Sequence, residues 1–466
     1  MIGRFLAALL AVSLAASTAR AADFDARPWL DDLAQLRGVL ETRYANRDWL
    51  EHDRGVDLGG LLGSAADALK AAHNETEARA ALDRLIRRIG DGHVEIDWAK
   101  VASGGEAGGG SPCDRFDPAF ATPGPAAGLP GYRALPADPL FPAGIAPVGT
   151  ARIGVLRIAV FGPQADPSLC PLATQTLKPP PAVPCDEVCG DRVMHQAEVL
   201  MTGRFEARLR ALKAAGATVL LVDLSDNGGG SEWAEAAARM VTARPLRSER
   251  LGFVRGAQWI KEWGDLEAKL RIAADGSPPA DKARLLALAA QVRAARAQAG
   301  QVCDGTGCER LGRAGFATGL VPQARASTFA GKPWGEWVFS PAEYPYRDGV
   351  WRGPLIVLVN QETWSAAEEF AAILQDNRAG VILGERTGGA GCGHTDGAQP
   401  VVLANSRAKV SVPDCVRFRA DGSNEVRGII PDVLVGSKLQ DGKALKAQLI
   451  AAKLPEAIRK ASAAGR

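Results

Sequence analysis

The chain has 466 residues, of which 47% are hydrophobic and 23% charged, with 52 glycines and 29 prolines. This composition is typical of a globular protein with a large core and excludes disordered, collagen-like and polytopic membrane chains. The chain has 55 lysine and arginine residues and 53 acidic residues, which gives a net charge of +2. So small a positive charge does not indicate binding to the phosphate backbone, and we expect no nucleic-acid partner.

The N-terminus has the pattern of a secretory signal. Arg4 precedes an apolar run from Phe5 to Ala16, and Ala19-Arg20-Ala21 places small residues two apart. The pattern predicts a signal peptide over residues 1–21 and a secreted or periplasmic protein. An N-terminal anchor is the alternative, but the run is shorter than the roughly 20 residues that span a bilayer. We therefore expect no integral membrane span after cleavage.

An even number of cysteines in an exported chain favours disulfides. The chain has Cys113, Cys170, Cys185, Cys189, Cys303, Cys308, Cys392 and Cys415. The short spacings of Cys185/Cys189 and Cys303/Cys308 suggest disulfides that close short loops. Cys392 and Cys415 could form a bridge between two neighbouring strands. A zinc site built from Cys170, Cys185 and Cys189 is the alternative, but it lacks the paired short spacings and neighbouring histidine of such sites.

Residues 22–98 are predicted to form an N-terminal helical bundle. Leu82, Leu85 and Ile89 recur at helical spacing in the last of its two or three helices. Gly90-Asp91-Gly92 is typical of a helix end, and His93 to Trp98 alternates like a strand. The Gly- and Pro-rich residues 99–150 are expected to be an irregular connection.

Strands and helices then alternate, which predicts an α/β core of parallel strands over residues 151–436. The expected strands are 153–161, 218–224, 355–359 and 380–383, and the expected helices are 204–215, 231–241 and 365–375. The runs 401–403, 410–412 and 416–418 suggest a β-meander. An insertion over about 245–345 contains an expected helix at 282–299, and residues 437–466 are expected to form a C-terminal helical tail.

Three features of the sequence could carry chemistry. Ser365 follows a buried strand and opens a helix, where free backbone N–H groups could stabilise an oxyanion, although Ser365-Ala366-Ala367-Glu368 is also a capping box. Gly228-Gly229-Gly230 leaves a strand and could supply further N–H groups, or be a plain turn. A phosphate-binding loop is a weaker alternative because no lysine follows.

His93 is a candidate base for a nucleophilic serine because it follows a tight turn. A packed or solvated turn residue is the alternative. His394, in the later Gly-rich loop, competes for the same role.

Four motifs occur in a characteristic order along the chain. They are Asp91-Gly92-His93, Asp223 to Gly230, Ser365-Ala366-Ala367-Glu368 and Glu425 to Asp432. In this combination the chain resembles peptidase family S41, which contains the C-terminal processing proteases and the tricorn-core-like proteases, over residues 28–98 and 151–435. The resemblance implies a core like that of the crotonase and Clp protease superfamily.

The family has two catalytic arrangements. The processing proteases use a Ser–Lys dyad in a Gly-Glu-x-Thr-x-Gly-Lys frame, whereas here Gly384 to Gly389 is followed by Ala390, and no lysine lies between Lys332 and Lys409. The tricorn-like branch uses serine, histidine and glutamate, which the resemblance assigns to Ser365, His93 and Glu425. That branch often has a serine before the histidine, where this chain has Gly92.

The resemblance implies acyl transfer without cofactor or metal. His93 would take the proton of Ser365 as it attacks a peptide carbonyl, and Glu425 would orient His93 directly or through a hydroxyl. The oxyanion would face the N–H groups of Gly229, with Gly228 as the near alternative, and of Ala366.

The expected partner is a protein or peptide substrate, and the oligomeric state stays open. Processing proteases usually carry a PDZ domain between the helices and the core, but residues 99–150 are about half the length needed, so we expect none. The insertion over 245–345 is then the candidate lid or substrate wall.

Two alternatives belong to other classes: a non-catalytic protein that binds peptides or apolar ligands on the same fold, and a structural envelope-associated protein. The presence of Ser365, His93 and Glu425 together favours an enzyme, because a binding protein needs no such set.

Overall fold

The computed structural model describes residues 24–98, 113, 116–117, 122–178, 185–301, 303, 309–395 and 398–464. The predicted signal peptide and the Cys303/Cys308 pairing lie outside these residues. No described helix combines the length and the apolar composition that a membrane crossing requires.

A seven-stranded sheet forms the centre of the fold, in the order β13-β9-β8-β5-β4-β3-β2. The strands are β2 (Arg133–Ala134), β3 (Ala143–Val148), β4 (Ala151–Arg157), β5 (Val219–Asp223), β8 (Leu355–Val359), β9 (Val381–Gly384) and β13 (Val433–Leu434). Five of them, from β13 to β4, are parallel, and β2 and β3 are antiparallel. The predicted α/β core with parallel strands is therefore confirmed.

The fold differs from the prediction at residues 133–148. These residues were expected to be irregular, but β2 and β3 extend the sheet at its edge. Gly144 and Pro147 lie within β3 and obscured its pattern, although Pro147 lies beyond the two residues of β3 that pair with the edge strand β2. A Cβ on Gly144 would come within 2.4 Å of the Tyr132 ring, so the glycine permits close packing here.

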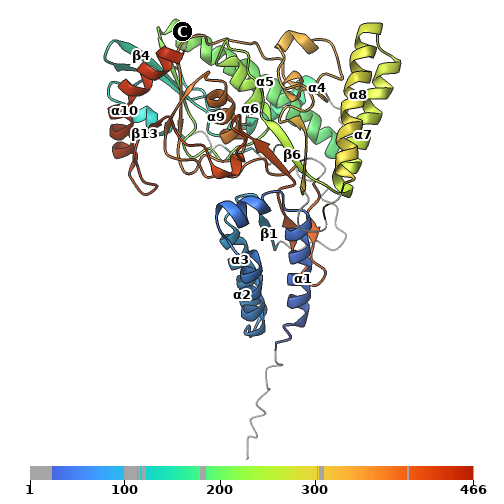
Figure 1. Cartoon of the computed structure of the whole chain (residues 1–466). Coiled ribbons are helices and arrows are strands. Elements are labelled where there is room, and N and C mark those ends of the chain that lie inside the picture. The colour runs from blue at the N-terminus through green and yellow to red at the C-terminus, as the bar shows by residue number, and fades with distance from the viewer. Residues whose placement is uncertain are drawn as a thin grey trace, which may run out of the picture.

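Helices cover both faces of the sheet (Figure 1). One face packs against α4 (Leu169–Leu177), α5 (Glu187–Ala214), α6 (Trp233–Met240) and α9 (Ala366–Asp376), and the other against α10 (Lys443–Ala464). Leu220 and Val222 of β5 face the first layer, and Val219 and Leu221 face the second. Because both faces are covered, the central strands are continuous apolar runs.

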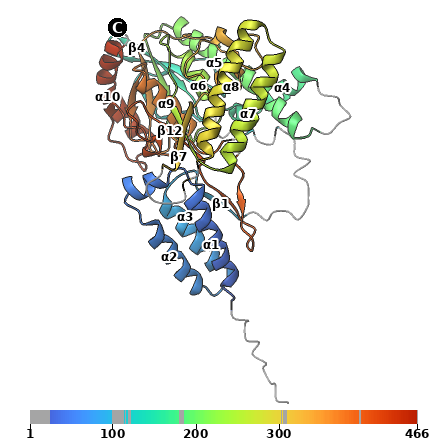
Figure 2. The ribbon, with the colours of Figure 1, turned by 45° about the vertical axis from the view of Figure 1, so that its right-hand side comes forward.

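The N-terminal helices lie side by side below the sheet (Figure 2). They are α1 (Arg27–Thr42), α2 (Leu58–Lys70) and α3 (Glu75–Ile89), and α3 ends at Gly90, whose φ is +66°. Their core also contains residues of a small antiparallel sheet, β1 (Glu95–Asp97), β11 (Lys409–Ser411) and β10 (Val401–Val402). The bundle thus shares its core with the C-terminal half of the chain.

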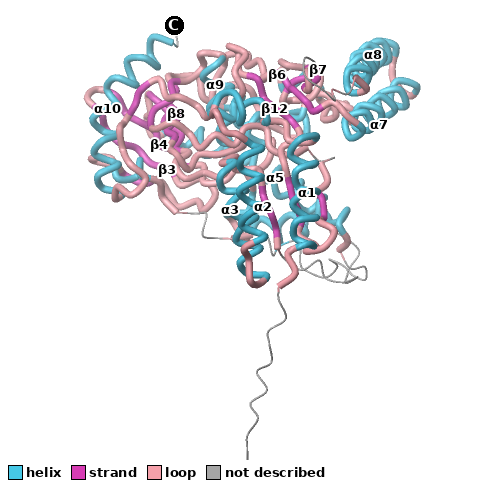
Figure 3. Tube along the Cα trace, turned by 60° about the horizontal axis from the view of Figure 1, so that its bottom comes forward, coloured by secondary structure: helices cyan, strands magenta, loops and turns pink. Residues whose placement is uncertain are grey.

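The predicted β-meander is wrong in its third strand. β12 (Cys415–Phe418) pairs with β6 (Arg250–Val254), which in turn pairs with β7 (Leu311–Phe316). Pro413 separates β11 from β12 and cannot donate to a ladder. The insertion contains β6, β7 and two packed helices, α7 (Ala257–Asp275) and α8 (Pro279–Ala299), which project at one side of the molecule (Figure 3).

Candidate active site

Ser365 lies at the junction between β8 and α9 in an unusual backbone conformation. Its φ is +55° and its ψ is −122°, a region that residues with a Cβ rarely occupy. The Ser365 N–H donates to Glu368 at 3.0 Å, and the Ser365 carbonyl accepts from the N–H groups of Glu368 and Glu369. The Glu368 side chain thus makes the hydrogen bond to the Ser365 N–H that the predicted capping box requires. This bond holds the sharp turn in place.

Glu368 joins the serine turn to the loop that follows β9. One carboxylate oxygen accepts from the Gly389 N–H at 2.8 Å and from the Thr387 hydroxyl, and the other accepts from the Ala390 N–H at 2.8 Å. Burial raises the pKa of Glu368 to about 7. From the sequence, Glu368 is recognisable only as a helix cap. Its other partners are 19 to 22 residues away, and no local pattern indicates these contacts.

The glycine loop after β5 lies against the serine turn. The Trp364 N–H donates to the Asn227 carbonyl at 2.9 Å, which ties the two loops together. A Cβ on Gly229, whose φ is +107°, would come within 2.8 Å of the Ser365 Cβ. Only glycine therefore allows this approach.

The expected oxyanion donors differ in their hydrogen bonding. The Gly229 N–H, which was the first choice, donates to the Asn227 side chain at 2.8 Å. The N–H groups of Gly228 and Ala366 have no protein acceptor in the part of the chain that the structure describes. The near alternative, Gly228 together with Ala366, therefore fits the role better.

His93 is fixed at its backbone and at its ring. Its N–H donates to Asp91 at 3.0 Å, and Asp91 also accepts from the Tyr44 hydroxyl and the Asn46 amide, both at 2.9 Å. The ring Nδ1 lies 2.9 Å from the Ala390 carbonyl oxygen. Because a carbonyl only accepts, Nδ1 carries the hydrogen, so in the neutral imidazole the lone pair is on Nε2. This is the tautomer that a general base requires.

Glu425 is placed differently from the expectation. It is 1% exposed and forms a two-pronged ion pair with Arg417, and among the hydrogen bonds of the described residues none joins it to His93. The expected orienting contact is made instead by the Ala390 carbonyl. Burial alone would raise the pKa of Glu425, but the Arg417 cation holds it below its usual value.

Arg417 is a functional candidate that the sequence analysis missed. From β12 it reaches the Gly391 carbonyl at 2.8 Å and the Ser365 carbonyl at 3.3 Å, and it also pairs with Glu369 at 3.3 Å. Glu425 thus contacts Arg417, which in turn contacts the carbonyls of Ser365 and Gly391. A single arginine in a strand gives no sequence signal for such a buried position.

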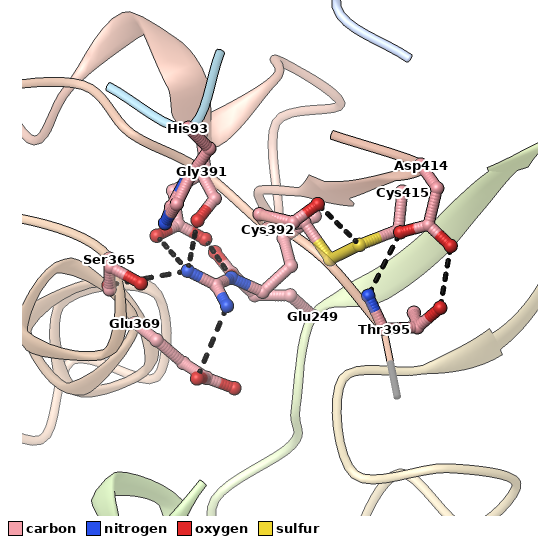
Figure 4. Close-up of a disulfide and its surroundings, with 12 residues drawn as sticks. His93, Glu249, Ser365, Glu369, Gly391, Cys392, Thr395, Asp414 and Cys415 are labelled. Atoms are coloured by element: carbon pink, nitrogen blue, oxygen red, sulfur yellow. Dashed lines mark hydrogen bonds and ion pairs between the residues drawn. A yellow bond between two sulfur atoms is a disulfide. The ribbon is translucent and has the colours of Figure 1, made fainter. Parts of the chain in front are cut away.

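An open cleft of about 470 Å³ brings Ser365, His93 and Gly228 together, whereas Glu425, Gly229 and Ala366 do not line it. Its described lining comprises Gly92, His93, Glu95, Asp226, Gly228, Glu362, Trp364, Ser365 and Ala390. Figure 4 shows His93, Gly391 and Ser365 close together. No described residue of the insertion over 245–345 lines this cleft, so the structure gives no support to its role as a lid or wall.

His394, the competing base, lies beside the cleft. Its ring packs edge-on against His93 with 5.6 Å between the ring centroids, but His394 lines a separate small cavity with Asp414. Burial, together with the neighbouring His93, lowers the pKa of His394.

Gly92 stands where a serine was expected by resemblance. A Cβ at Gly92 would come within 2.1 Å of the Trp364 ring. The indole therefore occupies the space that a side chain at this position would need.

Two predicted disulfides are confirmed, Cys185–Cys189 and Cys392–Cys415, and a third joins Cys113 to Cys170. The zinc alternative is wrong, because all three of its cysteines are in disulfides. The Cys392–Cys415 bridge connects the loop that carries Ala390 and Gly391 to the start of β12.

Comparison with known proteins tests the resemblance. The family model of peptidase family S41 matches residues 153–435, more than half of the chain. The chain belongs to peptidase family S41. This S41 member is a serine-type peptidase, and its family implies a protein or peptide substrate. A search of curated proteins found no match.

Solved structures agree on the fold of this S41 peptidase. Mature CPAF is 16% identical with a TM-score of 0.62, and the alignment covers 94% of this chain and 98% of that one. Mature CPAF complexed with lactacystin is 17% identical with a TM-score of 0.56, covering 92% and 99%. At these identities the likeness concerns the fold alone.

Proposed function

We propose that the protein is an exported serine endopeptidase in which Ser365 is the nucleophile and His93 the general base. Glu425 supports the site through Arg417. The observation that carries the proposal is the shared cleft: Ser365, in a turn with positive φ, and His93, whose Nδ1 donates to the Ala390 carbonyl, line one cavity although 272 residues separate them.

The mechanism follows from this arrangement. His93 Nε2 takes the hydroxyl proton as Ser365 attacks the peptide carbonyl, and the oxyanion faces the N–H groups of Gly228 and Ala366. When the intermediate collapses, His93 protonates the leaving amine. Water then attacks the acyl-enzyme with His93 again as base, which restores the free serine.

Arg417 and Glu425 hold the framework of this reaction. Arg417 donates to the carbonyls of Gly391 and Ser365, so it couples the loop that orients His93 to the turn that carries the nucleophile. Glu425 compensates the buried cation. We infer that the pair maintains the position of the Ala390 carbonyl relative to Ser365.

Three disulfides support export, since such bonds persist in oxidising compartments. We propose the predicted division of the chain, with a signal peptide over 1–21, a helical bundle over 22–98 and a protease core from 151 to 436. The edge strands within residues 133–148 are added to that core.

A fluorophosphonate probe tests the proposal. Purified protein should be labelled at one site per chain, and S365A should lose the label, whereas S64A, which alters an exposed serine of α2, should keep it. Failure of the folded wild-type protein to react, or labelling that persists in S365A, would contradict the assignment. A protein that only binds ligands on this fold would remain unlabelled.

A further inference from the structure

A second cluster of chemically capable side chains lies outside the catalytic cleft. His195 and Glu198 are three residues apart on one face of α5, and Glu343 ends the short helix η7 (Ser340–Glu343). His195 Nδ1 lies 3.0 Å from Glu343 Oε1, and one ligand atom of each residue lies within 4.8 Å of the others. None of the three lines the cleft.

The cluster sets two carboxyl groups against one imidazole. Glu198 is only 7% exposed, and burial raises its pKa to about 7, with Glu343 adding repulsion and a hydrogen bond with Ser231 opposing the shift. Glu336 also acts on His195. The carboxylates Glu343, Glu198 and Glu336 are the main charges that act on His195. A bound cation would compensate this arrangement.

We propose that His195, Glu198 and Glu343 bind a divalent transition-metal ion, with Zn²⁺ as the best match. One imidazole nitrogen and two carboxylate oxygens are ligands that Zn²⁺ accepts, at about 2.0–2.2 Å. Such distances place neighbouring ligand atoms about 3.4 Å apart in a tetrahedron. The separation of His195 and Glu343 is already close to this, and small side-chain rotations would bring Glu198 into place.

The exposure of the cluster also suits a metal. The His195 and Glu343 side chains are 42% and 35% exposed, so an ion can enter and water can complete its coordination. The buried Glu198 would anchor it from below. Because the ligands come from α5 and η7, the ion would clamp the end of the insertion to the helix layer of the core, and its loss should lower stability.

Isothermal titration with ZnCl₂ tests the proposal on protein freed of metal with EDTA. We expect one site per chain whose affinity falls at least tenfold in H195A and in E198Q. H73A, which removes an exposed histidine of the N-terminal bundle, is the matched control and should bind as the wild type does. Zn²⁺ should raise the Tm of the wild type and of H73A but not of H195A.

Two neighbouring imidazoles, His93 and His394, could also attract zinc. The H93A and H394A variants should therefore keep the proposed site. Absence of zinc binding by the wild type, equal affinity in H195A and E198Q, or loss of the site in H93A would overturn the proposal. If E198Q does not fold, E343Q supplies the same comparison at a partly exposed ligand.

Discussion

At the scale of single residues, the site depends on backbone groups as much as on side chains. The Ala390 carbonyl fixes the His93 tautomer, and the Ala390 N–H is in turn held by Glu368. Ser365 and His93 could be found from sequence because a serine at a strand–helix junction and a histidine after a helix-ending turn leave local patterns. The Ala390 carbonyl and Arg417 leave none, since any residue has a carbonyl and burial of a lone arginine depends on tertiary contacts.

Gly92 tests how tightly the site is packed. Gly92→Ser should destabilise the fold by about 1–3 kcal/mol and lower kcat, because the new side chain meets the Trp364 ring. The change is measured by urea unfolding and by turnover of labelled casein. W364A should be the compensating partner: the double variant G92S/W364A should regain stability relative to G92S. If G92S alone is as stable and as active as the wild type, the indole does not restrict this position.

In the proposed mechanism, Glu425 acts through Arg417. Glu425→Gln should cost about 3 kcal/mol of unfolding free energy, because a buried cation loses its two-pronged partner. It should also lower kcat more than it changes KM, because the displaced Ala390 carbonyl affects the chemical step. Glu249→Gln is the matched control on the same arginine: Glu249 lies farther from Arg417, at 3.7 Å, and burial raises its pKa well above its usual value, so its loss should matter less.

The same residue predicts a pH dependence. Arg417 lowers the pKa of Glu425 in the folded state, so its contribution to stability is present above about pH 4.3, the usual pKa, and is lost as the pH falls through the lower folded value. Acid unfolding curves should therefore be less steep for E425Q than for the wild type. Identical slopes would show that the pKa of Glu425 is not lowered in the folded protein.

At the scale of elements, the catalytic loop is held by a disulfide. Removal of Cys392–Cys415, as C392A/C415A, should destabilise the protein by about 2–4 kcal/mol and reduce kcat, because the bridge restrains the loop next to Ala390 and Gly391. The C185A/C189A variant is the control. That bridge joins residues only 4 apart in the sequence, and neither cysteine lines the cleft. Full activity of C392A/C415A, or an equal loss in the control, would contradict this role.

Strands and helices that are buried along most of their length could be predicted from the sequence. β5 and β8 are buried throughout and were expected within one residue of their bounds, as was α9. β3 was missed because Gly144 and Pro147 interrupt its pattern. β12 was assigned to the wrong sheet, since its partner β6 is more than 160 residues away and local alternation carries no information about pairing.

At the scale of the whole molecule, the cleft lies where two cores meet. The N-terminal bundle carries His93, while the sheet and its helices carry Ser365, and the bundle's core includes Val410 and Val426 from the C-terminal half. The Asn424 side chain donates to Asn46 at 2.8 Å, which links this half to the residues that hold Asp91. The family resemblance could name the residues that meet, but the local sequence could not, because their meeting depends on this shared core.

Turnover of labelled casein by folded H93A and H394A shows which histidine activates Ser365. We expect H93A to lose about 10³-fold or more of kcat/KM with little change in Tm, whereas H394A should stay within about tenfold of the wild type. Wild-type turnover by H93A, or loss confined to H394A, would contradict the assignment of His93 as the base that activates Ser365.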